Sequence, residues 1–327
     1  MQEERRDDNR RQGSGRRRLR ILCLGAGALG GYFGGRLIEA GTPVTFLVRP
    51  ARQQNLREKG LRIESTYGNY STQVNTITSA EGCEPFDLIL LGSKAYDLDS
   101  AMAAIAPAVG PQTMILPILN GLSHLDRLNE RFGSARVLGG VAKIAATLTE
   151  DGTIKHLNDW RYLIFGEQNG QLSERVMALK AILDTTSLVA TASSDIMQVM
   201  WEKLVHLSTI AGMTCLMRAS VGEIARTPSG SALMTTFLET NAAIATSEGY
   251  QPSDAFMAEY RAILANPQSP YTASMLRDIE RKGPTEGDHI IGFMLEKARK
   301  HGVDASMHQI VMVHLQSYEQ RRAAGRF

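Results

Sequence analysis

A glycine-rich hexapeptide is the part of this sequence whose residue types and spacing most directly suggest chemistry. It runs Gly25-Ala26-Gly27-Ala28-Leu29-Gly30 and has the pattern G-x-G-x-x-G. In this pattern the first glycine permits a tight turn, the second lets the backbone approach a pyrophosphate, and the third lets a helix pack against a strand. Unpaired N–H groups and the positive dipole end of that helix then face the phosphates. The pattern predicts a dinucleotide site.

The residues on either side supply the context that this motif requires. An apolar run at 21–24 precedes the glycines, a helix-like segment follows them to about residue 41, and a second apolar run occupies 44–48. Strand, glycine-rich turn, helix and strand is the order of a dinucleotide-binding unit. The alternative is a glycine-rich turn in an unrelated α/β protein, because glycines are common in turns.

The end of the second strand indicates which dinucleotide is bound. An NAD-binding unit usually has Asp or Glu there, whereas an Arg accommodates the 2′-phosphate of NADP. This chain has Arg49, followed by Arg52 one turn later, and no carboxylate between residues 48 and 56. A guanidinium can bind a phosphate through two hydrogen bonds. The sequence therefore favours NADP(H); the alternative is that Arg49 is a solvated surface residue.

Two charged residues later in the chain could take part in proton transfer. Lys203 has apolar neighbours on a predicted helix, and a partly desolvated lysine is a better proton donor near neutral pH. Glu286 lies near the start of another predicted helix. Structural alternatives exist for both: Lys203 could be a surface lysine with a buried stem. Thr285 and Asp288 have the spacing of a capping box, so Glu286 could merely complement the helix dipole.

The elements that must position these residues follow from hydrophobic patterning. Strands and helices alternate through residue 193 at the spacing of βαβ units, which predicts a doubly wound, mostly parallel sheet of Rossmann type. Strand-like runs lie at 61–63, 74–77, 86–91, 114–119, 137–141, 153–156 and 162–165, and helical stretches at 51–59 and 101–108 and before 182. Because ligands bind beyond the carboxyl ends of such strands, the glycine turn, Arg49, Lys94 and Asn120 should meet in one cleft.

The second half of the sequence has a different character. Helical patterns occupy 196–210, 231–247, 253–264, 284–301 and 306–321, with almost no strand signal between them. We therefore predict three parts: a disordered basic arm (1–20), an NADP-binding α/β domain (21–193) and an all-helical domain for substrate and catalysis (194–327). No internal repeat is evident.

Composition limits the classes of protein to consider. The net charge is +2, but residues 1–20 hold eight Arg and four acidic residues, so the remainder is mildly acidic. This distribution argues against nucleic-acid binding by the folded body. The arm lacks the apolar core of a signal peptide, and no apolar run is long enough to span a bilayer. Three scattered cysteines and seven histidines show no metal-ligand spacing, so we expect no metal site and a reducing cytoplasm.

Several short motifs together give the chain a resemblance to the ketopantoate reductase (2-dehydropantoate 2-reductase) family across nearly all of residues 21–325. Beside the glycine turn and Arg49, they are Ser93-Lys94-Ala95-Tyr96, Asn120-Gly121-Leu122, Trp201-Glu202-Lys203-Leu204, Ser274-Met275-Leu276-Arg277-Asp278-Ile279 and Thr285-Glu286-Gly287-Asp288. A serine twelve positions before the glutamate is the most telling spacing. The resemblance implies NADPH-dependent reduction of a 2-oxo acid, 2-dehydropantoate to pantoate, in pantothenate biosynthesis.

The resemblance also assigns roles. It implies that Lys203 is the general acid, that Glu286 positions the substrate and the lysine, and that Ser274 holds the substrate. The implied catalytic residues are thus Lys203 and Glu286, and the implied substrate-binding residues are Asn120, Lys203, Ser274 and Glu286. The candidate cofactor-binding residues are Gly25, Gly27, Ala28, Leu29, Gly30, Arg49, Lys94 and Asn120. The partner is a small-molecule 2-oxo acid, and a homodimer is compatible with the sequence.

One departure from the family pattern leaves the substrate open. Pantoate-forming members carry asparagines four and eight residues after the catalytic lysine, where this chain has Leu207 and Ala211. A buried substrate hydroxyl left without a partner there would cost roughly 1–3 kcal/mol. The alternatives are a reductase of a different small oxo or hydroxy acid, or an NADP(H)-binding sensor without turnover.

Overall fold

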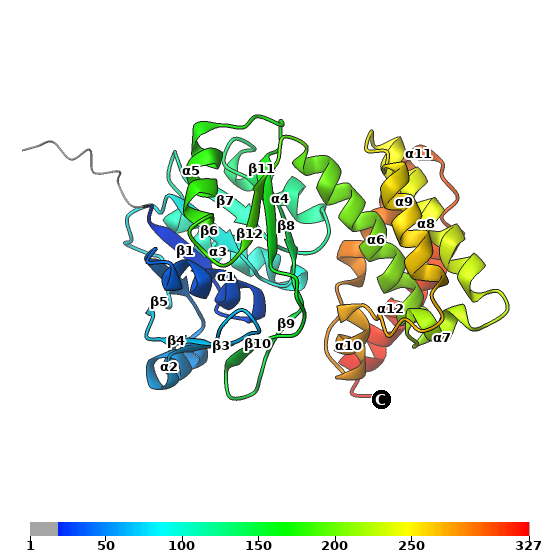
Figure 1. Ribbon diagram of the computed structural model, residues 1–327, viewed down its shortest axis with the longest axis horizontal. Coiled ribbons are helices and arrows are strands. Elements are labelled where there is room, and N and C mark those ends of the chain that lie inside the picture. Colours follow the sequence, from blue (N-terminus) through cyan, green and yellow to red (C-terminus); the bar gives the residue numbers. More distant parts are fainter. Residues whose placement is uncertain (1–18, 327) are drawn as a thin grey trace, which may run out of the picture.

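The computed structural model describes residues 19–326, and the first half of the chain is built around a five-stranded parallel sheet (Figure 1). From edge to edge the strands are β5 (Asn75–Ile77), β2 (Val44–Leu47), β1 (Ile21–Leu24), β6 (Leu88–Leu91) and β7 (Met114–Pro117). Every neighbouring pair is parallel, and the strand order reverses beside β1. The prediction of a Rossmann-type sheet is confirmed.

The central strands are apolar runs because helices or further strands cover both faces of the sheet. Every residue of β6 and of β7 is buried, as expected for parallel strands enclosed on both sides. Because the strands are parallel, their carboxyl ends lie at one edge. That edge bears the glycine loop after β1, Arg49 after β2, residues 92–94 after β6 and Asn120 after β7.

A second, smaller sheet packs on the first helix of the fold. Its strands, in order, are β4 (Tyr70–Thr72), β3 (Leu61–Glu64), β10 (Thr153–His156) and β9 (Ala146–Leu148). Helix α1 (Ala28–Glu39) lies between the two sheets. Its glycines allow this close fit, because a Cβ at Gly34 would lie 2.7 Å from the Phe46 ring and one at Gly31 would lie 2.4 Å from Ile154.

A third sheet extends the far edge of the main one. It contains β12 (Val189–Ala192), β11 (Tyr162–Glu167) and β8 (Leu138–Lys143), with β11 antiparallel to β8. A hydrogen bond of 2.8 Å from Ile115 N to Arg136 O connects this region to β7. The remaining helices of this half are α2 (Pro50–Lys59), α3 (Leu98–Ile105), α4 (Ser123–Phe132) and α5 (Glu174–Leu183), with short 3₁₀ turns at Ala95–Asp97 and Ala106–Ala108.

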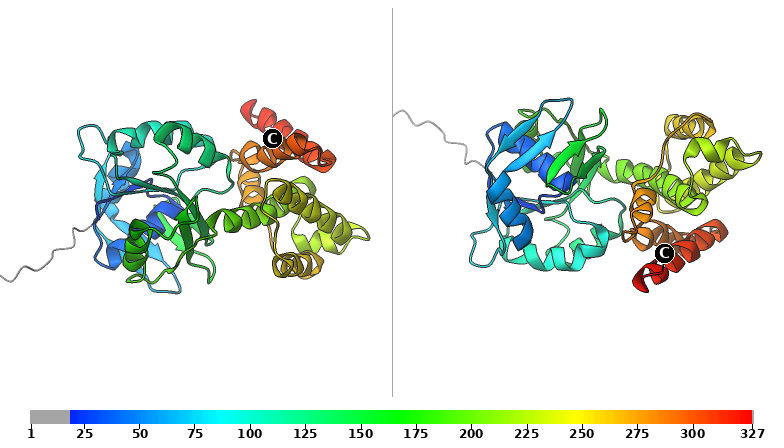
Figure 2. Two further views of the ribbon diagram at one scale, coloured as in Figure 1. Left: turned by 90° about the horizontal axis from the view of Figure 1, so that it is seen from above. Right: turned by 90° about the horizontal axis from the view of Figure 1, so that it is seen from below.

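Beyond residue 193 the described chain is helical. The elements are α6 (Ile196–Met217), α7 (Val221–Ala225), α8 (Gly230–Ser247), α9 (Asp254–Ala265), α10 (Ser274–Glu280), a π-helical turn at Asp288–Gly292, α11 (Phe293–His301) and α12 (Ser306–Ala323). Figures 1 and 2 show this group beside the α/β half, with α6 running from one to the other. The predicted all-helical C-terminal region is confirmed. Within residues 19–326, no helix has the length and apolarity that crossing a membrane requires.

Helix α6 is packed into both halves. At its start, Ile196 and Met200 lie against Gly139 of β8, where a Cβ would be 2.8 Å from the Ile196 side chain. Toward its end, Gly212 faces Phe237 of α8, with a corresponding distance of 2.5 Å. A single continuous helix therefore connects the sheet to the core of the helical half.

The structure differs from the sequence predictions in several elements. Helix α6 continues to Met217, seven residues beyond the predicted end, and α4, α7 and α10 were not predicted. The predicted helix at 284–301 begins at residue 287 and opens with the π-helical turn. The predicted arm falls almost wholly on residues 1–18, which lie outside the described part. Arg20, assigned to the arm, is instead anchored: its N–H donates to Asp87 at 2.8 Å, and its guanidinium pairs with Glu84.

Candidate active site

The glycine loop has the geometry that a bound pyrophosphate needs. Gly25 has φ of +84°, a conformation that disfavours other residues, and its N–H donates to Leu47 O. Gly30 lies so close to the loop that a Cβ would be 2.3 Å from Gly25 O. By contrast, nothing lies within 4 Å of a Cβ placed on Gly27, the N-cap of α1. The first turn of α1 holds no acidic residue, so this open, electropositive helix start fits a phosphate.

Two arginines lie near this loop and have different surroundings. Arg49, at the N-cap of α2, has a side chain that is 80% exposed and pairs with Asp97 at 3.3 Å. Arg52 is enclosed: its Nε donates to Ala26 O at 3.0 Å and its Nη1 donates to Gly152 O at 3.2 Å. Burial, and then the charge of Arg62, lower the pKa of Arg52. Arg52 therefore braces the glycine loop, whereas Arg49 remains accessible to a ligand.

The predicted catalytic lysine meets the predicted asparagine. Lys203 Nζ donates to Asn120 Oδ1 at 3.1 Å and to Ala142 O at 3.0 Å. The side chain is half-buried, and its burial, together with repulsion from Lys143, lowers its pKa to about 8, although Glu286 acts in the opposite direction. Lys203 comes from α6, whereas Asn120 follows β7 and Ala142 lies in β8. The ammonium is thus held at the junction of the two halves.

Glu286 lies on the helical side of the same junction. It is 5% exposed and accepts hydrogen bonds from Ala95 N at 3.2 Å and from Lys94 Nζ at 3.3 Å. No capping hydrogen bond from a side chain accompanies the helix start that follows it. Glu286 therefore engages the α/β half, and the alternative of a helix-capping role is not supported. Among the described residues, no hydrogen bond joins Glu286 directly to Lys203; the two interact through charge.

Lys94 is held between two carboxylates from the helical half. Besides Glu286, it pairs with Asp278 of α10 at 3.1 Å. Burial by itself would lower the pKa of Lys94, but the charges and hydrogen bonds of Glu286 and Asp278 outweigh it and raise the pKa. Ser274 begins the same helix one turn earlier and is partly exposed. Its hydroxyl makes no hydrogen bond to another residue of the described chain, so it is available to a ligand.

Comparison with known proteins identifies the arrangement. The family model described as "Ketopantoate reductase PanE/ApbA" matches residues 21–170, and the model described as "Ketopantoate reductase PanE/ApbA C terminal" matches residues 195–319. The chain belongs to the ketopantoate reductase family. It is accordingly an NADP-dependent oxidoreductase, and its cofactor is NADP(H).

Individual relatives agree with this assignment. The "Uncharacterized oxidoreductase YkpB" of Bacillus subtilis (strain 168) is 35% identical over 301 residues, covering 92% of this chain and 99% of that protein. A crystal structure of 2-dehydropantoate 2-reductase from Geobacter metallireducens GS-15 is 27% identical, with a TM-score of 0.84 and coverage of 91% and 99%. D-mandelate dehydrogenase with NADH and anilino(oxo)acetate is similar with a TM-score of 0.82 and coverage of 93% and 99%, but at 22% identity this likeness shows the fold alone.

In this ketopantoate reductase family member, the positions that depart from the family pattern lie on α6 beyond Lys203. Leu207 is partly buried against the core, and Ala211 is fully buried. The neighbouring His206 is occupied elsewhere: its Nε2 lies 2.9 Å from the Tyr271 hydroxyl, and its ring stacks on Tyr260 at 4.2 Å between centroids. This side of the site is more apolar than the asparagines of the family pattern would make it.

Sequence reasoning missed three residues around the site. Asp278 contacts Lys94 and lies four positions after Ser274, so helical spacing could have indicated it. His289 lies three positions after Glu286 and contacts the loop that bears Asn120. Lys143 follows Ala142 and lowers the pKa of Lys203 through its charge; no local pattern marks it.

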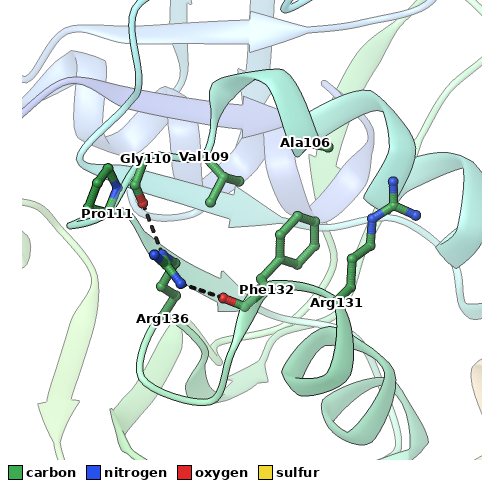
Figure 3. A pocket seen from close by; sticks show the side chains of 7 residues that line it. All are labelled: Ala106, Val109, Gly110, Pro111, Arg131, Phe132 and Arg136. Atoms are coloured by element: carbon green, nitrogen blue, oxygen red, sulfur yellow. Dashed lines mark hydrogen bonds between the residues drawn. The ribbon is translucent and has the colours of Figure 1, made fainter.

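A separate hollow lies away from these residues. It has a volume of about 410 Å³ and is lined by Ala106, Val109, Gly110, Pro111, Arg131, Phe132 and Arg136 (Figure 3). Its Arg136 already donates to Gly110 O at 3.0 Å and to Phe132 O at 2.8 Å. The hollow contains no predicted site residue, and its Arg136 is committed to the fold. Within the described chain, no group of three His, Cys, Asp or Glu residues is arranged to hold a metal ion.

Proposed function

We propose that this oxidoreductase reduces the ketone of a small 2-oxo acid, with Lys203 as the general acid. The observation that supports this most directly is the position of Lys203 Nζ, 3.1 Å from Asn120 Oδ1 and 3.0 Å from Ala142 O. An ammonium has three N–H donors. With two directed at these oxygens, the third remains for a substrate carbonyl.

The roles of the residues follow from the charge that develops in the reaction. NADPH, when bound, supplies the hydride that adds to the ketone carbon. The carbonyl oxygen then gains negative charge, which the nearby Lys203 ammonium stabilises before giving up its proton to form the hydroxyl. A pKa of about 8 leaves Lys203 protonated at neutral pH yet acidic enough to transfer that proton.

We further propose how the remaining predicted residues act. The Ser274 hydroxyl holds the substrate, and Asn120 orients Lys203 through their hydrogen bond. Glu286 fixes Lys94 and the backbone of Ala95 at the end of β6. Arg49 binds the 2′-phosphate, since its guanidinium is exposed beside the glycine loop.

The substrate that we propose first is 2-dehydropantoate, whose product is pantoate, because the pattern of Lys94, Asn120, Lys203, Ser274 and Glu286 follows that of the family. A second candidate is a 2-oxo acid with an apolar side chain. It is favoured by Leu207 and Ala211, which offer no partner to a substrate hydroxyl. A protein named D-mandelate dehydrogenase shares the fold, so the fold by itself does not select the substrate.

The decisive experiment is NADPH oxidation with a panel of substrates: 2-dehydropantoate, pyruvate, 2-oxoisovalerate and phenylglyoxylate. The highest kcat/KM for 2-dehydropantoate would support the first proposal, and a higher value for an apolar acid would support the second. If NADPH binds but no member is reduced, the proposed reductase activity on 2-oxo acids fails.

Leu207→Asn tests the pocket itself. If the native site prefers apolar acids, the new amide should shift the preference toward 2-dehydropantoate by about tenfold, the value of one hydrogen bond to a buried hydroxyl. Adding Ala211→Asn should extend the shift, but Ala211 is fully buried. The double variant therefore needs a melting curve as a control. No shift in either variant would show that these positions do not contact the substrate.

We also propose a reducing cytoplasm as the compartment, since Cys23, Cys83 and Cys215 are free and two of them are buried. A homodimer remains a prediction, which light scattering would test.

A further inference from the structure

His289 lies where the loop bearing Asn120 meets the segment bearing Glu286. It belongs to the π-helical turn Asp288–Gly292, three residues after Glu286. Its Nδ1 is 2.5 Å from Ser123 Oγ, at the start of α4. Its Nε2 is 3.4 Å from Nδ1 of His124, and the two rings stack at 5.6 Å between centroids. One side chain of the helical half therefore makes several contacts with the first two residues of α4 in the α/β half.

The contact with the loop is close as well as polar. Gly121 has φ of +85°, and a Cβ there would lie 2.8 Å from Cδ2 of His289 and 3.2 Å from its backbone oxygen. The backbone of Asn120 also acts on the ring, because it raises the pKa of His289 against the larger effect of burial. Gly121, the residue after Asn120, is thus packed directly against His289.

Both imidazoles are neutral near physiological pH. Burial, followed by the charges of His289 and Lys203, lowers the pKa of His124 to about 3. Burial also lowers the pKa of His289, although Glu286 opposes this effect. A neutral imidazole offers one donor and one acceptor. His289 can therefore accept from the Ser123 hydroxyl at Nδ1 while its Nε2 donates to Nδ1 of His124. These two hydrogen bonds fix the orientation of the His289 ring.

These contacts place His289 between two groups that the proposed reaction needs. On one side is Asn120, which holds Lys203; on the other is Glu286, which holds Lys94. Helical π-turns widen a helix locally and are frequent at functional sites. A displacement of the ring would change the spacing between Asn120 and Glu286, because the peptide link to Glu286 is short and Gly121 leaves no gap.

We propose that His289 is a positioning residue that sets the spacing between the Asn120–Lys203 pair and Glu286 across the junction of the two halves. The proposal rests on the proposed function, since it assumes that Lys203 delivers the proton. Ser123 is its hydrogen-bonding partner, and His124 provides the stacking surface. The residue does not contact the reacting atoms; it acts through Asn120 and Glu286.

The test compares two replacements of similar size. His289→Asn keeps a polar atom near the position of Nδ1, whereas His289→Leu removes all hydrogen bonding. With saturating NADPH, His289→Leu should lower kcat at least tenfold with little change in the NADPH Kd, and His289→Asn should recover most of that loss. His301→Asn is the matched control: His301 ends α11 and pairs with Glu248 at 2.7 Å, so its replacement should leave kcat unchanged.

A second measurement does not depend on turnover. Reductive ¹³C-methylation allows the pKa of Lys203 to be followed by NMR, with Lys203→Arg to assign the signal. The Asn120 oxygen accepts from the Lys203 ammonium and so favours its charged form. If His289 keeps Asn120 against the lysine, the Lys203 pKa should therefore fall below about 8 in His289→Leu, but not in His289→Asn. Ser123→Ala should produce a smaller change in the same direction. The Ser123→Ala variant also allows the proposal to be tested if His289→Leu does not fold.

The outcomes separate the two proposals. If Lys203→Ala retains turnover, the proposed function fails, whatever His289 does. If Lys203→Ala is inactive but His289→Leu has native kcat and a native Lys203 pKa, the proposed function stands and the positioning role is refuted. Equal losses in His289→Leu and His289→Asn, accompanied by equal falls in melting temperature, would indicate packing alone and would also overturn the positioning role.

Discussion

At the end of the candidate site beside the glycine loop, Arg49 is exposed to solvent and forms an ion pair with Asp97. At the chemical end, Lys203 and Glu286 are enclosed by contacts from both halves of the chain. Exposed ion pairs contribute little to stability, so Arg49 can exchange Asp97 for a phosphate at small cost. These contacts orient the enclosed groups, and fixed, oriented groups are the arrangement that stabilises developing charge. Changes at the two ends should therefore have separable effects, on cofactor affinity at one end and on turnover at the other.

The largest effect should come from Lys203→Ala. Removing a general acid lowers turnover by about 10²–10⁴-fold, while NADPH binding should remain near native because the ammonium acts on charge that develops in the transition state. Single-turnover kinetics with a separate NADPH titration would measure both quantities. Lys180→Ala is the control, because Lys180 lies on α5, away from the candidate site, and pairs with Asp184. Near-native turnover in Lys203→Ala would remove the proposed mechanism.

Glu286→Gln should have the next largest effect. The amide can still accept from Ala95 N, but it no longer offers a charge to Lys94. Loss of a hydrogen bond to a charged group costs about 1.5–3 kcal/mol, which corresponds to roughly a tenfold to hundredfold loss of kcat/KM. Steady-state kinetics would check this, with Glu296→Gln on the exposed face of α11 as the control. If Glu286→Gln changed only the NADPH affinity, Glu286 would act on cofactor binding and not on turnover, against this prediction.

The pH dependence of reduction should follow the protonation of the Lys203 ammonium. The proton donor is present below its pKa of about 8 and is lost as the pH rises above that value. The kcat/KM for the 2-oxo acid should accordingly be level near neutral pH and fall about tenfold per pH unit above 8. A profile that stays level to pH 10 would show that the lysine is not the proton donor or that its pKa is not lowered.

The smallest of these effects should come from Arg49→Ala, and it should fall on the cofactor. NADPH should bind more tightly than NADH to the native protein, and the variant should reduce that preference by about tenfold or more, the value of a charge-assisted pair. Kd values from nicotinamide fluorescence would measure it. Arg57→Ala, in the last turn of α2, should leave the Kd values for NADPH and NADH unchanged. Equal native affinity for NADPH and NADH would refute the role of Arg49.

The parts of this architecture that could be predicted are those encoded locally. The glycine loop, Arg49 and the buried strands each produce a pattern within a few residues. The structure places the glycine loop and Arg49 at the carboxyl edge of the sheet that these strands form. Helix α4 was missed because its Leu125, Leu128 and Phe132 are separated by charged residues, although their helical spacing was visible. Helix α10, with seven residues, is too short for a periodic pattern.

The contacts across the junction could not be predicted from patterning. Lys94 and Asp278 are separated by 184 residues, and Ser123 and His289 by 166. Such pairs depend on how two halves dock, and no local pattern links the two residues of a pair. Resemblance to a family indicated Lys203 and Glu286 together with Asn120 and Lys94, but it assigned no role to Asp278 or His289. The capping-box alternative for Glu286 was reasonable on spacing, and only the hydrogen bonds from Ala95 and Lys94 decide against it.

The sharing of α6 between the halves has a consequence for how the molecule unfolds and how it can be dissected. A fragment ending before Ile196 would expose the side of β8 that Ile196 and Met200 cover, and a fragment starting later would lose the helix against which α8 packs. Neither half should therefore be expressible alone in folded form, and chemical denaturation should proceed as one cooperative transition. The helix that carries Lys203 would then also be the one that prevents the two halves from melting independently.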